Sequence, residues 1–297
     1  MLKLKKGNAT IAFDSRSYVL TSVDYGAVSA THSTAKGANQ VGERMMNATL
    51  DTRDIEIVGF IRSHAPVDIP PEERAEYFAK DMKAKKAALY QMCEPRHEFE
   101  ILPDDTLSLR CYATSTVRFA PSKLINNTRF AQFVIDATSY DPLFADAVAR
   151  YRKIAEWLPN FVWPLIIPIE GFTFADRTDS FITTLQNDGD VETGLLIHFT
   201  ASSTVENPTL TNVATGEFIK LNRTIAAGET VIVNTNYGAE GVAVYDGYTM
   251  SDAINDLDLD STFLQAPVGT AEFHYAAHSN VNAMSVTIYY HQRYLGV

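Results

Sequence analysis

The stretch Met284-Ser285-Val286-Thr287-Ile288-Tyr289-Tyr290 places apolar side chains at every second position, so that Met284, Val286, Ile288 and Tyr290 share one face. A period of two predicts a β-strand with one buried face. Working backwards, Leu195 to Phe199 shows the same alternation, and Asn187-Asp188-Gly189 and Asp246-Gly247 are hairpin-type turns. Turn signals arrive about every ten residues, the spacing of a β-sandwich. The sequence therefore predicts a sandwich in the C-terminal half.

The N-terminal half combines short strands with one clear helix. Arg53 to Val58, residues 106–114 and residues 129–137 alternate like half-buried strands. Pro70-Pro71 and the acidic Glu72-Glu73 open a helix that Pro95 ends. Its apolar stripe consists of Ala75, Phe78, Met82, Leu89 and Met92. We predict that Phe78, Met82 and Leu89 are buried beneath the sheet of this half.

Two shorter segments complete the expected fold. Residues 145–158 predict a second, short helix, because Val148, Tyr151 and Ile154 fall on one side. The polar, glycine-containing segment Thr31 to Gly42 predicts an exposed loop or hairpin tip. The predicted fold class is therefore mainly β with one or two helices, an α+β protein.

The distribution of charge and proline predicts two domains. From Ile166 onward there are four Lys and Arg against sixteen Asp and Glu, a net charge of −12. With 25 basic and 36 acidic residues in the whole chain, the first 165 residues hold 21 and 20, a net charge of +1. Pro159, Pro164 and Pro168 interrupt the chain between the halves. We expect a first domain over 1–145, a linker over 146–168 and a second domain over 169–297, with a final strand from Val286 that alternatively returns to the first domain.

Several function classes are disfavoured by composition. The acidic C-terminal half lacks the clustered Lys and Arg that phosphate contacts need. No apolar run reaches the roughly 20 residues of a membrane span, and no secretory signal follows Met1, so we expect no membrane insertion. Cys93 and Cys111 are the only cysteines, and we expect both to be free thiols.

No catalytic motif emerges, and we assign no catalytic, cofactor-binding or metal-ligating residue. The chain has no nucleophile elbow, P-loop, dinucleotide-binding glycine pattern, CxxC or HExxH. Asp256, Asp258 and Asp260 alternate like the start of a calcium loop, but Ser261 and Pro267 stand where a glycine and a bidentate acid are expected.

Three further patterns have ordinary structural interpretations. His274 and His278 have the spacing of a helical metal pair, but they lie in strand-like sequence. Lys83, Lys85 and Lys86 suit a phosphate site less well than a solvated helix face. Asn236 and Tyr237 combine an amide with an aromatic ring, as sugar sites do, although turn residues are the simpler interpretation.

The order of several landmarks resembles that of the distal tail proteins of long-tailed phages. In the first half the landmarks are Arg53 to Ile61, the helix end Leu89 to Pro95 with Glu94 in place of the family's usual Asn, Gln132 to Ala137, Asp141-Pro142-Leu143-Phe144, and Phe161 to Leu165. In the second half they are Asn187 to Gly194, Glu206-Asn207-Pro208, Thr215-Gly216-Glu217, Gly228 to Thr235, Ser261 to Leu264, and Tyr290 with Arg293 to Val297. The segment Leu264 to Thr270 departs from the family's Leu-x-x-Gly-Asn.

This resemblance implies a non-enzymatic virion protein of the tail tip or baseplate, assembled in the bacterial host cytoplasm. It implies that the first domain forms a homohexameric ring around the tail channel and that the second is a galectin-like β-sandwich. Its partners would be the tail tube protein, the tail-tip hub protein and receptor-binding proteins, while DNA passes through the channel without specific binding. The resemblance carries over no catalytic residues, no metal and no cofactor.

Two rival interpretations belong to other classes. In the first, the sandwich carries the function, as a carbohydrate-binding or receptor-binding tail component in host adhesion. In the second, the chain is a cell-wall hydrolase, which the lack of an acid/base or metal constellation disfavours.

Overall fold

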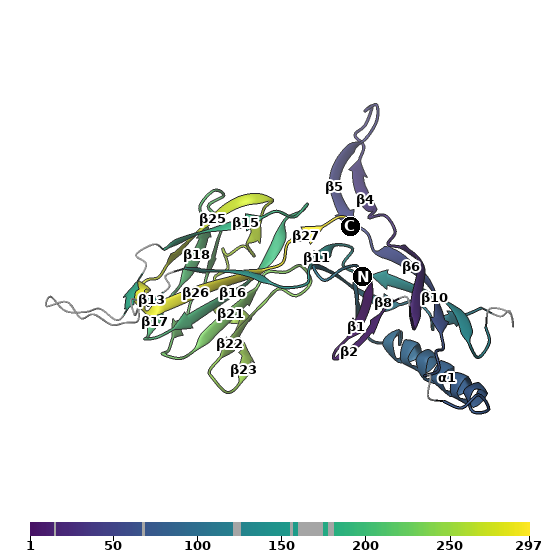
Figure 1. Cartoon of the computed structure of the whole chain (residues 1–297). Helices are drawn as coiled ribbons and strands as arrows, with labels where there is room; N and C mark the ends of the chain where they lie inside the picture. Colours follow the sequence, from purple (N-terminus) through teal and green to yellow (C-terminus); the bar gives the residue numbers. More distant parts are fainter. Residues whose placement is uncertain (15, 67–68, 121–125, 155–156, 160–174, 178–180) are drawn as a thin grey trace. The chain divides into compact units, whose positions relative to one another are not determined.

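The computed structural model describes residues 1–297 except 15, 67–68, 121–125, 155–156, 160–174 and 178–180. The chain forms two compact units (Figure 1). The first unit comprises Met1–Ala147 and Tyr294–Val297, and the second comprises Val148–Arg293. The second unit is thus an insertion into the first. The predicted landmark Phe161 to Leu165, and the part of the predicted linker from residue 160 onward, lie outside the described residues.

The first unit is built on a sheet that follows the order β2-β1-β7-β8-β10-β6-β3. Its longest pair is β6 with β10, antiparallel, with Arg53 opposite Ser139 and Arg62 opposite Phe130. Alternate residues of both strands are buried, as their sequence predicts. The strand bounds are β1 Lys3–Lys6, β2 Ala9–Ala12, β3 Tyr18–Asp24, β6 Arg53–Arg62, β7 Phe99–Leu102, β8 Leu107–Ala113, β9 Arg118–Phe119, β10 Phe130–Ser139 and β11 Phe144–Asp146.

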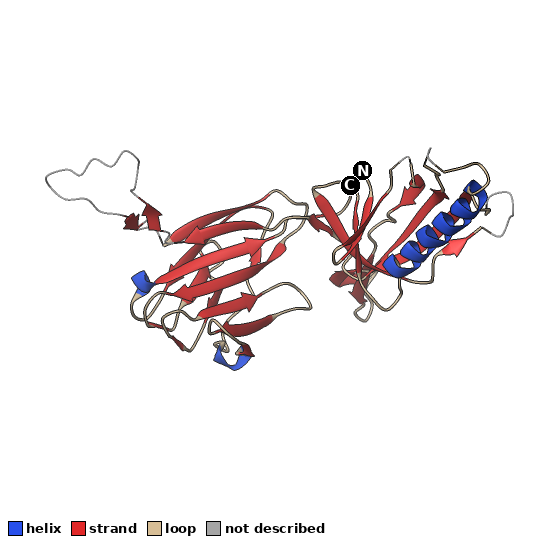
Figure 2. Ribbon diagram, turned by 60° about the horizontal axis from the view of Figure 1, so that its bottom comes forward, coloured by secondary structure: helices blue, strands red, loops and turns tan. Residues whose placement is uncertain are grey.

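The helix α1 (Arg74–Met92) lies along this sheet (Figure 2). Met82, Leu89 and Met92 are buried in the core of the unit. The prediction for Phe78 was wrong, because its side chain is only half-buried. The guanidinium of Arg129 lies 4.8 Å from the centre of the Phe78 ring and covers it there.

The second unit is a β-sandwich, as predicted. One sheet has the order β12-β26-β16-β21-β22-β23, and the other has the order β15-β25-β18-β19. Figure 2 shows the two layers. The strand bounds are β12 Arg150–Ile154, β15 Ile182–Asn187, β16 Thr193–Ala201, β18 Thr209–Asn212, β19 Phe218–Lys220, β21 Thr230–Asn234, β22 Gly241–Tyr245, β23 Met250–Asp252, β25 Gly269–Ala276 and β26 Met284–Tyr290. Smaller pairs are β13 Trp157–Pro159 with β14 Ala175–Arg177 and β17 Val205–Glu206 with β20 Thr224–Ile225, while β24 Gln265–Ala266 pairs with β16.

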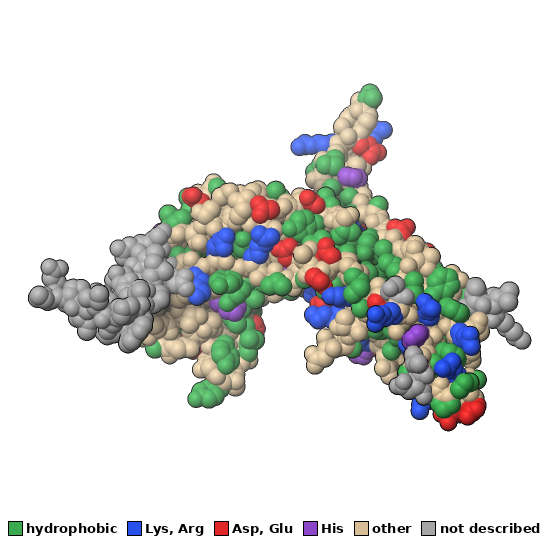
Figure 3. Space-filling model, viewed as in Figure 1, with side chains coloured by type: hydrophobic (Ala, Val, Ile, Leu, Met, Phe, Trp, Pro, Cys, Tyr) green, Lys and Arg blue, Asp and Glu red, His purple; other side chains and the backbone are tan. Residues whose placement is uncertain are grey.

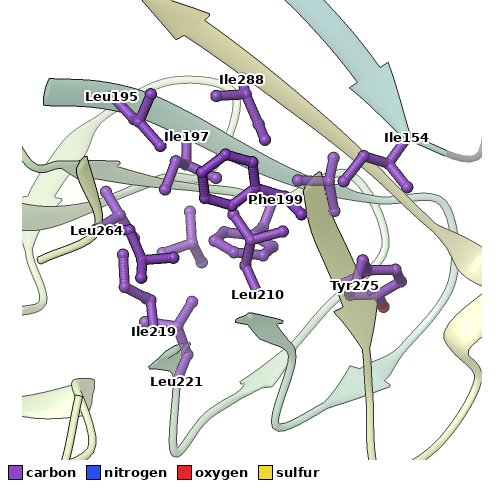
Figure 4. Packing of buried hydrophobic residues seen from close by; sticks show 14 of the residues in the cluster. Ile154, Leu195, Ile197, Phe199, Leu210, Ile219, Leu221, Leu264, Tyr275 and Ile288 are labelled. Atoms are coloured by element: carbon purple, nitrogen blue, oxygen red, sulfur yellow. The ribbon is translucent and has the colours of Figure 1, made fainter. Parts of the chain in front are cut away.

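The core of the second unit lies between its two sheets (Figure 4). Phe199, Leu210 and Ile288 are fully buried there and come from β16, β18 and β26. The predicted alternation of residues 195–199 and 284–290 is confirmed, since every second side chain in each stretch enters this core. Antiparallel strands with one buried face account for the period of two in the sequence.

The predicted helix over residues 145–158 was wrong. Residues 150–154 instead form β12, which pairs with β26 so that Tyr151 faces Tyr289 and Ile154 faces Val286. Ile154 is buried, whereas Val148 and Tyr151 are exposed. These residues form a strand because the edge of β26 offers hydrogen-bond partners to their main chain. A short helix would leave the main-chain groups at both of its ends unpaired.

The contrast between two helix positions gives a stability prediction. Leu89→Ala removes a fully buried side chain and should cost about 2–5 kcal/mol in the free energy of unfolding. Phe78→Ala removes a half-buried ring and a cation–π contact, and should cost only about 1–2 kcal/mol. Urea unfolding of both variants measures the difference. Equal losses would contradict this assignment of the core.

The insertion of the second unit predicts where a stable fragment begins. A fragment of residues 148–293 keeps β12 and should unfold in one cooperative transition. A fragment of residues 169–297 follows the boundary expected from the sequence but lacks β12 and the buried Ile154, so its melting temperature should be lower. Calorimetry of the two fragments tests this, and identical melting temperatures would show that β12 adds nothing.

Candidate interaction surfaces

The most exposed regular element of the first unit is a two-stranded ribbon formed by β4 (Ala30–Ala35) and β5 (Arg44–Leu50). The two strands pair with each other only, from Ala30 opposite Leu50 to Ala35 opposite Arg44. Every residue of both strands is exposed except Ala30, which is half-buried. Figure 1 shows the ribbon projecting from the rest of its unit. The segment Thr31 to Gly42 is therefore the outer part of a hairpin, as predicted.

The ribbon carries apolar side chains that nothing in its own unit covers. Met45, Met46 and Leu50 are 60%, 63% and 47% exposed. A two-stranded hairpin without a packed face is at best marginally stable in water, so a ribbon of this kind favours a partner that covers it. Residues 30–51 carry no net charge, because Lys36 and Arg44 balance Glu43 and Asp51, the residue that follows β5. The sequence analysis missed the apolar side of β5, for which the adjacent Met45-Met46 after Gly42 was the available signal.

A second feature of the first unit is a row of carboxylates across three neighbouring strands. Asp24 of β3 and Asp136 of β10 both stand opposite Glu56 of β6. Asp24, Glu56 and Asp136, with Asp54, border a depression of about 470 Å³. Asp136 is ion-paired with Arg118 at 2.8 Å. The remaining acids give this part of the sheet a negative surface.

Two of the three aspartates that resemble a calcium loop, Asp256 and Asp258, accept hydrogen bonds from side chains of their own unit. The carboxylate of Asp256 accepts a hydrogen bond from Arg223 at 2.8 Å, and that of Asp258 accepts from Lys220 and Asn222 at 3.1 and 2.9 Å. The hydrogen bond from Asn222 is the main reason that the pKa of Asp258 is lowered. These acids stabilise the loop by pairing with cations of their own unit.

The histidine pair forms no metal centre in the described part of the chain, where no three His, Cys, Asp or Glu side chains gather around a possible ion. His274 lies in β25, and His278 lies beyond the end of that strand. The main-chain N–H of His278 donates to the main-chain carbonyl oxygen of Glu206 at 2.9 Å.

Two of the three clustered helix lysines have partners within the first unit. The ammonium of Lys85 donates to Asp81 at 2.8 Å and to the carbonyl of Arg62 at 2.9 Å. That of Lys86 donates to Asn126 at 2.7 Å and lies 4.7 Å from the centre of the Phe119 ring. These contacts bind α1 to its surroundings and leave Lys83 as the solvated member.

The amide and the ring proposed for a sugar site lie in the turn after β21. The hydroxyl of Tyr237 donates to Glu192 at 3.1 Å, and the Asn236 side chain donates to the Asn234 side-chain oxygen at 2.7 Å. Asn236 borders a cleft that also contains Tyr289, whereas Tyr237 is not part of its lining.

The comparisons with known proteins agree with this architecture. Residues 188–294 match the model of a family described as siphovirus-type tail component, C-terminal domain. The whole chain is similar in structure to the SPP1 Dit (gp 19.1) protein, described as a paradigm of the hub adsorption apparatus in Gram-positive infecting phages. That likeness has a TM-score of 0.65 and 10% sequence identity over 99% of both chains.

Chains of the phage p2 baseplate in its activated conformation with Ca and with Sr also match. Their TM-scores are 0.47 and 0.49, with 9% identity over 98% of each chain. No curated protein sequence matches the chain. The predicted resemblance to phage distal tail proteins is confirmed, by the family match in the second unit and by the shared fold over the full length. Among the described residues, no helix combines the length and the apolar character that a membrane span requires.

Both cysteines are free thiols, as predicted, and the structure shows that both are buried. Burial raises the pKa of the Cys93 thiol to about 12, and it raises the pKa of Cys111 as well. At pH 8 both groups are therefore protonated in the folded protein, and the thiolate that reacts with iodoacetamide is scarce.

We expect no alkylation of the folded protein at pH 8 and modification of both thiols in guanidinium chloride, counted by mass spectrometry. Rapid labelling of Cys93 in the folded state would show that the end of α1 opens readily.

Proposed function

We propose that the chain is a structural protein of the phage tail tip or baseplate, in which the first unit forms a hexameric ring that joins the tail tube to the tail-tip hub. The exposed β4–β5 ribbon carries the ring proposal. Its apolar residues need cover, and residues 30–51 carry no net charge, so a second copy of the chain meets no net electrostatic repulsion there. The family match of residues 188–294 supports the tail as its location, assembled in the host cytoplasm.

The charges of the molecule fit this role. The sequence from residue 166 onward carries a net charge of −12, which favours an outward position for the sandwich, where like charges of neighbouring copies are far apart. Receptor-binding proteins would anchor there. The carboxylates of Asp24, Asp54 and Glu56 would repel phosphodiesters, which suits a ring that passes DNA without holding it.

The function that follows is assembly and not turnover. Asp256 and Asp258 are paired with Arg223 and Lys220 of the second unit, and Lys85 and Lys86 contact residues of the first unit. Both thiols are buried and protonated.

The ring proposal is tested by removing the apolar side of the ribbon. Met45→Ser combined with Met46→Ser should raise the concentration needed for half-assembly at least tenfold, which corresponds to about 1.4 kcal/mol. Wild-type protein should form six-fold rings, or pairs of such rings, by native mass spectrometry and electron microscopy. Deletion of residues 35–40, at the tip, should weaken the ring in the same direction.

The matched control is Met250→Ser, because Met250 is 65% exposed but lies on the second unit. It should leave assembly unchanged, and all variants should keep the melting temperature of the wild type. A protein that stays monomeric in the presence of its tail-tip hub partner, or a ribbon variant that assembles normally, would refute the proposal.

A further inference from the structure

The outer face of the six-stranded sheet in the second unit is nearly free of charge. Among its described outward positions only Lys153 and Asp252 are charged, and they lie on the two edge strands β12 and β23. The solvent face of an antiparallel sheet is usually polar. Here the strands present rings, aliphatic side chains and uncharged Ser, Thr and Asn side chains, in a part of the chain that is strongly acidic elsewhere. Figure 3 shows hydrophobic side chains over β22 and β23, which belong to this sheet.

Aromatic rings gather at one end of this face. The rings of Tyr151 and Tyr289, opposite each other on β12 and β26, have their centres 6.0 Å apart. The His198 ring lies 4.9 Å from that of Tyr289 on its other side. Tyr151 is 55% exposed and Tyr289 is half-buried. The three rings thus form a continuous aromatic strip that solvent reaches.

A cleft of about 220 Å³ adjoins this strip. It is lined by Gly194, Leu196, Asn234, Asn236, Tyr289 and His291, with Ala149 and Tyr290. Its volume is below the roughly 300–1,000 Å³ of drug-sized ligand sites, so it suits one small ring and not an extended molecule.

The amide side of the cleft is held in place by short-range contacts. The Asn234 side-chain oxygen accepts from the main-chain N–H of Asn236 at 3.1 Å and from its side-chain amide at 2.7 Å. Gly194 permits this arrangement, because a Cβ there would lie 2.6 Å from the Asn236 Cα. The neighbouring Thr235 is fully buried and bonded to Leu195 and Leu264. The amides are therefore fixed before any ligand arrives.

His198 adds a polar atom without a partner. Its Nε2 is buried and makes no hydrogen bond within the described residues. Burial lowers the pKa of His198, so the imidazole is neutral at neutral pH. His198 is not part of the cleft lining, but it keeps the strip beside the cleft uncharged. An aromatic face beside fixed amides, with charge only on the edge strands of the sheet, matches a ligand that has C–H faces and hydroxyl groups but no charge.

We propose that this cleft, between the Tyr151–Tyr289 rings and the Asn234–Asn236 amides, binds one unit of a neutral saccharide. The sugar ring stacks on the tyrosines, and its hydroxyls bond to the amides. Anionic sugars bind more weakly, because the cleft lining holds no Lys or Arg that would compensate for desolvation of a carboxylate. Arg150, Arg152 and Lys153 flank Tyr151 but border a separate depression. The site goes beyond ring assembly and does not depend on it.

The test is saturation-transfer NMR on the full chain with D-glucose, D-galactose, N-acetyl-D-glucosamine and L-rhamnose, each up to about 100 mM, and D-glucuronic acid as the anionic comparison. At that concentration a site with a Kd of about 10 mM is mostly occupied. At least one neutral sugar should receive saturation, with glucuronic acid well below it. Tyr289→Ala and Asn236→Ala should each weaken binding at least tenfold, and Tyr151→Ala should weaken it without lowering the melting temperature.

The matched control is Tyr248→Ala, since Tyr248 is 94% exposed on the same unit but outside the cleft. This variant should bind as the wild type does. The proposal is overturned if no neutral sugar binds, if glucuronic acid binds equally well, or if the Tyr289, Tyr151 and Asn236 variants bind normally. Ring formation is measured in a separate experiment with the ribbon variants. A negative result for sugar binding therefore does not contradict the ring proposal.

Discussion

The buried guanidinium of Arg53 ties the end of the chain to the first unit. Arg53 is 1% exposed, donates to the carbonyl of Leu295 at 2.5 Å and lies 4.9 Å from the centre of the Phe144 ring. Burial lowers the pKa of Arg53, and the contacts with the carbonyl and the ring compensate for this costly desolvation. Residues 294–297 belong to the first unit through this contact and through the pairing of β27 (Arg293–Tyr294) with β11. A chain that must return there can carry the second unit only as an insertion.

An insertion separates the tasks of the two units. The first unit is built from chain segments on both sides of the insertion. The second unit closes its own sheet with β12, the segment that enters it, paired to β26, the strand that leads out of it. Because this pairing joins the two ends of the inserted segment, the sandwich has a continuous core that does not draw on the first unit.

The sequence predicted the features that repeat along one strand or one helix. The alternation at residues 195–199 and 284–290, the C-terminal part of α1 and the hairpin near Thr31 are all local patterns, and the structure has them. The sequence-based predictions were wrong where a residue far away in the sequence determines the local structure. Residues 150–154 became a strand because the edge of β26 was open, and Phe78 lies under Arg129 and not under the sheet. Neither partner could be inferred from local spacing.

The proposed saccharide cleft likewise could be predicted only in part from local sequence. Asn236 was noticeable in the sequence because an amide beside an aromatic residue is a local signal, but the ring next to its cleft is Tyr289 and not Tyr237. The alternation of residues 284–290 leaves Tyr289 on the face opposite the core, which gives no reason to connect it with a turn more than fifty residues earlier. Register across β26, β16 and β21 brings them together. In a sheet, a binding surface runs across the strands, and its composition is set by pairing that no single stretch of sequence contains.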